Sequence, residues 1–218
     1  MKNHVKITTV ESILDLFYPC YCKGCGKPGE IFCERCYNYN RRENPSFFAS
    51  NYCGFEQVVA CGIREGLLKK MILDYKFRSR RALAAVFSRM ISDEIARMGL
   101  SNFVIVPLPT VRKHIRARGF DHIMEICRRI EAPVEELIVR QKNTVQVGKQ
   151  SEERILQAKK AYRLADGVVI DKDKTYVLVD DVWTTGASMT EAGAVLRAAG
   201  AKHLVAIVLT KNDGYEFT

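Results

Sequence analysis

Short apolar runs alternate with amphipathic segments along most of this chain. The runs are rich in Val, Ile and Leu and are short enough for buried strands. They occupy residues 58–61, 103–106, 137–139, 176–179 and 203–209. Between them, apolar residues recur every three or four positions, which predicts helices over residues 63–75, 83–95, 123–130 and 189–199. This alternation predicts an α/β fold with a parallel sheet and helical crossovers.

The most distinctive segment is residues 176–188, Tyr-Val-Leu-Val-Asp-Asp-Val-Trp-Thr-Thr-Gly-Ala-Ser. Its apolar run predicts a buried parallel strand, so Asp180 and Asp181 lie at the carboxyl end, where open α/β sheets bind ligands. A loop of small and hydroxyl-bearing residues follows, namely Thr184, Thr185, Gly186, Ala187 and Ser188. Such a loop at a helix N-terminus can bind a phosphate through backbone N–H groups and hydroxyls. The two acids suit sugar hydroxyls or a hydrated Mg²⁺ instead.

Two Cys-x-x-Cys pairs lie near the N-terminus, Cys22 with Cys25 and Cys33 with Cys36. They offer four thiolates to one tetrahedral ion, for which Zn²⁺ is the expected metal. A disulfide framework is the competing interpretation. However, no apolar core of a secretory signal precedes these cysteines, so we expect reduced thiols and a cytoplasmic location. Cys20 could replace Cys22 as the first ligand. For the remaining cysteines we expect roles as small apolar side chains; these are Cys53, Cys61 and Cys127.

The chain has 218 residues, 47% of them apolar, which suffices for one sizeable α/β core and a small appendage. An appendage of about forty residues rarely holds a core unaided, so the metal would stabilise it. We therefore expect an N-terminal helix and zinc ribbon over residues 1–44 and the α/β domain over residues 45–218. A linker is expected within residues 38–50. No apolar run reaches the roughly 18 residues of a membrane span, so we expect a soluble protein.

Residues 177–188 closely resemble the phosphoribosyl-pyrophosphate signature of type I phosphoribosyltransferases. The resemblance implies a type I phosphoribosyltransferase-like parallel sheet flanked by helices. It also implies that Asp180 and Asp181 are the catalytic acids and contact the ribose hydroxyls of phosphoribosyl pyrophosphate, which binds with Mg²⁺. The loop of Thr184, Thr185, Gly186, Ala187 and Ser188 would then bind the 5′-phosphate.

Together with a short four-cysteine ribbon, this signature resembles the ComF family, in particular its ComFC and GntX type. Further similarity lies in residues 16–19, 106–109, 112–122 and 140–144, and at Gln146 and Arg154. Asp121 and His122 replace the family's commoner Asn-Gln, and the sequence does not assign their roles. The resemblance spans nearly the whole chain. It implies a phosphoribosyl-pyrophosphate-binding protein that acts on incoming single-stranded DNA in natural competence, with the DNA-uptake machinery as a partner.

The net charge of +9 indicates an anionic partner, and residues 110–163 carry thirteen Lys and Arg against seven Asp and Glu. Pro107 and Leu108 follow a strand where phosphoribosyltransferases receive pyrophosphate. Arg116 and Arg118 are candidates for binding pyrophosphate or DNA, because guanidinium groups bind phosphate oxygens bidentately. A solvated basic face is the expected role of Arg128, Arg129, Lys159 and Lys160.

The ribbon offers a second mixture of cations and aromatic rings, which suits single-stranded DNA. It comprises Lys23, Lys27 and Arg35 with Tyr21, Phe32 and Tyr37. Tyr21 or Phe32 could instead pack the ribbon against the larger domain. Two other functions also stay open: an active phosphoribosyltransferase in nucleotide salvage, and a non-catalytic sensor of a phosphoribosyl ligand. The donor half of the transfer reaction is present, whereas no acceptor-recognition motif is evident.

Overall fold

A computed structural model of the chain describes residues 20–78, 80–141 and 161–212. They form two compact units, the first ending at Glu43 and the second beginning at Asn44. Several sequence predictions lie outside the described residues: the N-terminal helix, the similarity at residues 16–19 and 142–144, and the positions Gln146, Arg154, Lys159 and Lys160.

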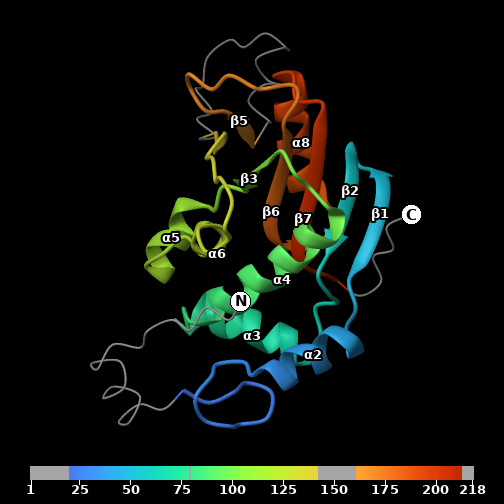
Figure 1. Ribbon diagram of the computed structural model, residues 1–218. Helices are drawn as coiled ribbons and strands as arrows, with labels where there is room; N and C mark the ends of the chain where they lie inside the picture. The colour runs from blue at the N-terminus through green and yellow to red at the C-terminus, as the bar shows by residue number, and fades with distance from the viewer. Residues whose placement is uncertain (1–19, 79, 142–160, 213–218) are drawn as a thin grey trace. The chain divides into compact units, whose positions relative to one another are not determined.

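The second unit is built on a five-stranded sheet (Figure 1). Its strands are β1 (Phe47–Tyr52), β2 (Phe55–Ala60), β3 (Phe103–Pro107), β6 (Thr175–Trp183) and β7 (His203–Lys211). The order is β1-β2-β7-β6-β3, in which β1 is antiparallel to β2 and every other neighbouring pair is parallel. The predicted α/β class with a largely parallel sheet is therefore confirmed.

The helices of this unit are α3 (Gly66–Phe77), α4 (Leu83–Met98), α5 (Arg112–Arg118), α6 (His122–Cys127) and α8 (Ala187–Ala198). Side chains alternate between the two faces of each strand. Tyr176 and Leu178 of β6 point to the face where α8 packs Ala192 and Leu196. The intervening β6 residues point to the other face, where α6 contacts β3 and β6 and α4 contacts β7. Buried apolar runs thus face helices on both sides, as a parallel sheet requires.

A small antiparallel hairpin of β4 (Ile138–Arg140) and β5 (Tyr162–Leu164) lies beside α8. Its Ile138 and Tyr162 are buried in the same apolar cluster as Leu196 of α8. The hairpin therefore carries Arg140 and Tyr162 close to the carboxyl end of the sheet.

The segment expected as a linker is mostly structured. Helix α2 (Glu34–Glu43) and strand β1 occupy most of residues 38–50, so only residues 44–46 connect them. Within the second unit, the side-chain amide of Asn44 accepts from the Ile63 N–H at 2.7 Å and donates to the Ile63 carbonyl at 3.0 Å. Among the described helices, none combines the length and apolar character needed to cross a bilayer.

Candidate functional site

A cavity of about 290 Å³ in the second unit lies at the carboxyl end of β6. Both predicted acids line it, together with hydroxyl and cationic side chains from α3, α5, α6, β4 and α8. Its charged and polar lining includes Lys76, Arg118, His122, Arg140, Asp180, Asp181 and Ser188. The cavity thus combines two carboxylates with several cationic groups.

The acids reach the cavity because β3 and β7, the two strands beside β6, stop pairing with it at different positions. Pairing between β3 and β6 stops at Pro107 and Val179, whereas β7 stays paired with β6 as far as Trp183. Asp180 and Asp181 therefore have no β3 neighbour and border an open edge. Strand β6 continues through the acids to Trp183, beyond the apolar run from which the strand was predicted.

Asp181 is buried and forms an ion pair with Lys76, a residue of α3 that the sequence pattern did not single out. Its Oδ2 atom also lies 3.7 Å from the Nε2 atom of His122. Burial lowers the pKa of Lys76 to about 8, while Asp180 opposes that shift. At neutral pH the lysine therefore remains mostly protonated and offsets the Asp181 charge.

His122 is held in one orientation by its neighbours. Its Nδ1 atom lies 2.9 Å from a guanidinium nitrogen of Arg118, and because arginine only donates, Nδ1 must be the acceptor. We therefore assign the proton to Nε2, which faces Asp181. Burial, together with the charges of Lys76 and Arg118, lowers the pKa of His122 to about 3. The imidazole is thus neutral near pH 7.

Asp180 has a different environment. Its Oδ1 atom accepts from the Asp181 N–H at 2.9 Å. Burial raises the pKa of Asp180 to about 7, although the charges of Lys76 and Arg140 lower it. Arg140 itself is fixed, since it donates to the Pro109 carbonyl at 3.0 Å and to the Tyr162 hydroxyl at 2.8 Å. Part of the Asp180 population is therefore protonated near neutral pH, when no ligand is bound.

This raised pKa predicts that Asp180→Asn stabilises the fold at alkaline pH. The unfolded carboxyl ionises near its ordinary value, so the folded state loses stability as pH rises from about 4 to about 7. The variant avoids that loss and should melt at least about 3 °C higher than wild type at pH 8. The difference should vanish at pH 4, which calorimetry at both pH values would measure. A variant less stable than wild type at pH 8 would contradict the raised pKa.

The predicted phosphate loop leads directly into α8. Gly186 has a φ of 75° and precedes the helix, and a Cβ atom there would overlap the indole ring of Trp183. Only glycine therefore fits this position without strain. The Thr185 hydroxyl accepts from the Ala187 N–H at 3.3 Å. Thr184, Thr185, Ala187 and Ser188 are exposed, and Ser188 is the loop residue that lines the cavity. The helix N-terminus can therefore accept an anion.

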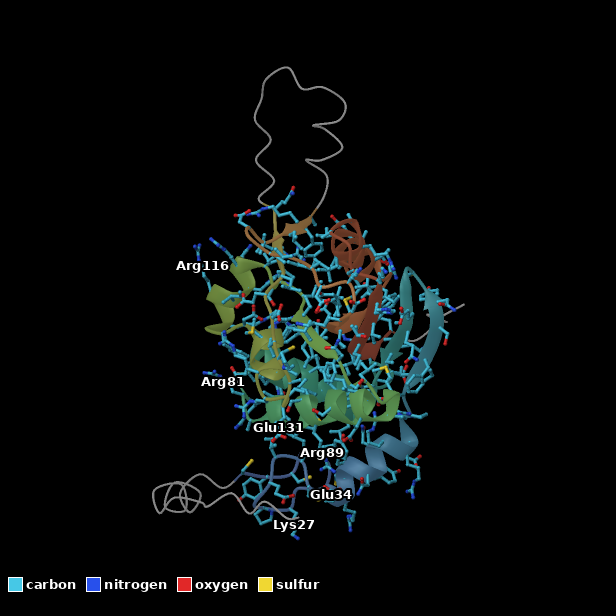
Figure 2. All side chains as sticks on the ribbon, turned by 45° about the horizontal axis from the view of Figure 1, so that its top comes forward. Lys27, Glu34, Arg81, Arg89, Arg116 and Glu131 are labelled. Carbon is cyan, nitrogen blue, oxygen red and sulfur yellow. The ribbon has the colours of Figure 1, made fainter. Side chains whose placement is uncertain are left out.

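The candidates for pyrophosphate or DNA fall into two groups. Leu108 and Arg118 line the cavity, whereas Pro107 is buried at the end of β3. Arg116 is exposed and does not line the cavity. Figure 2 shows its side chain projecting outward from α5. Arg118 is therefore placed for a ligand in the cavity, and Arg116 for a partner outside it.

The structure separates the roles of the Asp121-His122 pair. Asp121 begins α6, because its carboxylate accepts from the N–H groups of Ile123 and Met124 at 3.1 and 3.2 Å. It also accepts from the Thr110 hydroxyl at 3.0 Å. Asp121 is thus a helix cap, and His122 is the residue that lines the cavity.

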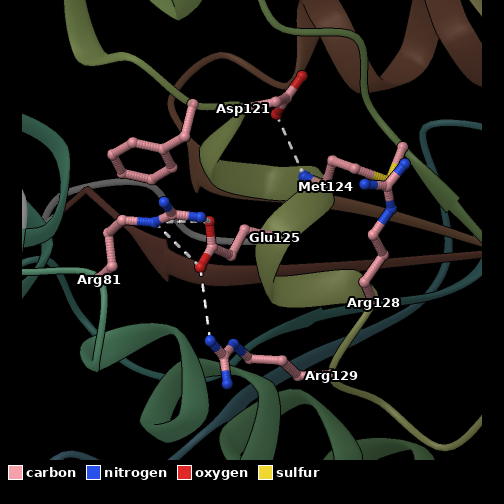
Figure 3. A pocket seen from close by; sticks show the side chains of 7 residues that line it. Arg81, Asp121, Met124, Glu125, Arg128 and Arg129 are labelled. Carbon is pink, nitrogen blue, oxygen red and sulfur yellow. Dashed lines mark hydrogen bonds and ion pairs between the residues drawn. The ribbon is translucent and has the colours of Figure 1, made fainter.

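A second hollow of about 370 Å³ lies near α6 (Figure 3). Glu125 binds Arg81 there with a shortest N–O distance of 2.5 Å, and Arg129 approaches the same carboxylate at 3.5 Å. Arg128 lies 4.0 Å from Glu136. Because these arginines pair with acidic side chains, they fit a solvated surface, as predicted for Arg128 and Arg129, better than they fit an anion-binding site.

In the first unit, the four predicted cysteines converge. The sulfur atoms of Cys22, Cys25, Cys33 and Cys36 all lie within 4.8 Å of one another, whereas Cys20 is not in this group. The Cys33 sulfur lies 3.6 Å from that of Cys22 and 3.7 Å from that of Cys25. A tetrahedral Zn²⁺ with Zn–S bonds of about 2.3 Å requires sulfur atoms about 3.8 Å apart. The cluster is therefore a candidate metal site with suitable spacing for zinc.

The backbone around the cluster supports this arrangement. Gly24 lies within the first pair and packs against the second: a Cβ atom there would lie 2.7 Å from the Cys36 sulfur, so glycine fits best at this position. Burial raises the pKa of the Cys22 thiol, but backbone N–H groups, including those of Cys33 and Gly24, lower it to about 6 overall. No disulfide links any of the eight described cysteines. As expected, Cys61 and Cys127 are buried, whereas Cys53 is partly exposed.

The aromatic residues of the ribbon do not all face solvent. Phe32 and Tyr37 are buried, and their rings meet edge to face with centroids 6.3 Å apart. Tyr21 and Tyr39 are exposed instead, at 55% and 58%. The expected stacking role of Phe32 and Tyr37 therefore does not fit, because their rings are inaccessible to a base.

Comparison with known proteins identifies a phosphoribosyl transferase domain over residues 80–217. The chain is 27% identical over 144 residues to the competence protein ComFC of Streptococcus pneumoniae, covering 66% of this chain and 63% of that protein. It is 24% identical over 185 residues to ComFC of Bacillus subtilis, covering 82% and 72%. Among solved structures, glutamine phosphoribosylpyrophosphate amidotransferase of B. subtilis matches with a TM-score of 0.44 and 17% identity, over 63% of this chain and 30% of that one.

Proposed function

Because this chain belongs to the phosphoribosyl transferase domain family, we propose that its cavity binds phosphoribosyl pyrophosphate together with Mg²⁺. One observation carries the proposal: a single cavity unites the acids, the start of α8 and cationic side chains from three other elements. Carboxylates suit ribose hydroxyls, whereas a helix N-terminus and guanidinium groups suit phosphates. This combination matches a sugar that carries phosphate at one end and pyrophosphate at the other.

Each part of the cavity has a chemical task in this proposal. The 5′-phosphate would accept from the Ser188 hydroxyl and from backbone N–H groups at the start of α8. The pyrophosphate would bind Arg118 and Arg140, whose guanidinium groups match its oxygens. Asp180 would accept from the ribose hydroxyls. Mg²⁺ would enter with the ligand and neutralise part of the pyrophosphate charge.

Replacing both acids, Asp180→Asn with Asp181→Asn, should weaken binding of Mg²⁺-phosphoribosyl pyrophosphate at least tenfold. Each charge-assisted hydrogen bond contributes about 1.5–3 kcal/mol, and the variant loses at least one of them. Isothermal titration calorimetry would measure the affinity. Asp166→Asn is the matched control, since Asp166 is exposed outside the cavity and should leave the affinity unchanged. Equal affinity of wild type and the double variant would overturn the ligand assignment.

We further propose that the protein acts on incoming single-stranded DNA in natural competence, in the cytoplasm and beside the DNA-uptake machinery. Two similar proteins are named competence proteins, and the net charge of +9 favours an anionic partner. The same titration with free nucleobases present would test the alternative of nucleotide salvage. Release of pyrophosphate in that experiment would assign transferase activity to the cavity.

A further inference from the structure

The two adjacent acids do not face the same way, because neighbouring side chains of a strand point to opposite faces of the sheet. Asp180 follows the alternation of Tyr176 and Leu178, which face α8. Asp181 points to the other face and meets Lys76 of α3 and His122 of α6. The acids therefore have different direct contacts, although the Lys76 charge acts on both, and they can have different tasks.

The Asp181 carboxylate is already engaged by protein groups. Its Oδ2 atom is fully buried, between the ammonium group of Lys76 and the Nε2 atom of His122 at 3.7 Å. A ribose hydroxyl cannot reach that atom without displacing the lysine. The pair itself is well shielded, since the side chains of Lys76 and Asp181 are only 13% and 12% exposed. Breaking it would leave a buried charge without compensation, which is costly.

Lys76 nevertheless lines the cavity, as does Arg118. An ammonium group has three N–H donors, and the contact with Asp181 leaves others for a ligand. Lysine commonly binds phosphate as a point charge. Lys76 also lies outside residues 80–217, so the family match does not assign it a role.

We propose that Lys76 is a ligand-binding residue and that Asp181 is its positioning residue, so that Asp180 alone receives the ribose hydroxyls. The inference rests on the proposed phosphoribosyl ligand. Lys76 donates to anionic oxygens of that ligand, while Asp181, which has the neutral imidazole of His122 on its other side, holds the ammonium group at the cavity wall.

A double-mutant cycle tests this division of tasks. Four proteins are titrated with Mg²⁺-phosphoribosyl pyrophosphate: wild type, Lys76→Met, Asp181→Asn and the double variant. We expect each single substitution to weaken binding about tenfold or more, because Lys76→Met removes the ammonium group and Asp181→Asn removes the carboxylate that positions it. In the Lys76→Met background, Asp181→Asn should change the affinity less than about twofold, since Asp181 acts only through Lys76. Lys76→Arg should keep part of the affinity, because it retains a cationic donor.

Three results would overturn the inference. A Lys76→Met protein with wild-type affinity would show that the lysine does not bind the ligand. An equal loss on Asp181→Asn in both backgrounds would show that this acid contacts the ligand directly. A wild-type protein that binds no phosphoribosyl pyrophosphate would remove the proposed function as well, so the two failures differ. If a single variant does not fold, the double variant still tests the inference, because it buries no unpaired charge. Wild-type affinity of the double variant would show that Lys76 does not bind the ligand.

Discussion

Protein purified under reducing conditions without chelator should carry one zinc ion per chain, and Cys33→Ser should lose it. The Cys33 sulfur lies within 3.7 Å of two of the other three sulfurs, so its removal leaves an incomplete tetrahedron. Structural zinc in small modules contributes about 10–16 kcal/mol of binding free energy, and most of that would be lost. Elemental analysis of wild type and variant measures this directly.

Loss of zinc should also unfold the ribbon, because a module with so few buried apolar side chains depends on its metal. Hydrogen exchange of residues 20–43 should become fast in Cys33→Ser, while the sheet of the second unit stays protected. Two matched controls should retain the zinc: Cys20→Ser, outside the sulfur cluster, and Cys53→Ser, in the other unit. Metal-free wild-type protein, or loss of zinc in Cys20→Ser, would contradict the four-cysteine assignment.

The sequence predicted the parts of the fold whose burial leaves a periodic apolar pattern. Residues 83–95 correspond to α4, whose apolar stripe is buried, and the run at 103–106 corresponds to β3. Helix α5 has no buried residue, so no apolar stripe existed to reveal it. Strand β1 was missed because its residues alternate between partial and full exposure at a sheet edge. An element was therefore predicted where its apolar side chains are buried, and missed where they are not.

The candidate site could likewise be predicted only in part from the sequence. The acids and the loop could be predicted because their residue types are adjacent in sequence and rarely combine by chance. The role of Lys76 could not be predicted, because a lysine in an amphipathic helix is usually expected to be exposed to solvent. Its partner Asp181 is also 105 positions away in the chain. The sequence also suggested one task for both acids, whereas alternation along β6 separates their surroundings.

Unlike the buried Phe32 and Tyr37, other side chains of the first unit that suit single-stranded DNA lie on its exposed surface. Tyr39 of α2 is 58% exposed, and the guanidinium group of Arg42 lies 5.4 Å from its ring centre. Arg35 and Arg42 border the same hollow as Tyr39. A ring beside cations suits unstacked bases and phosphates together. In the second unit, Arg116 offers an exposed cation on α5.

We expect the protein to bind single-stranded DNA with little sequence preference and with affinity that falls steeply as salt is added. Each phosphate-contacting cation contributes about 0.7–1 unit to the log–log slope, so Arg116→Ala should reduce the slope by that amount. Tyr39→Ala should lower affinity by about 1–3 kcal/mol, the worth of one stacked base, without changing the slope. Arg129→Ala is the matched control, because Arg129 pairs with Glu125. Fluorescence anisotropy titrations at several salt concentrations would measure both quantities. If zinc-loaded protein forms no complex at low salt, the role in DNA handling is wrong and the salvage enzyme becomes the preferred function.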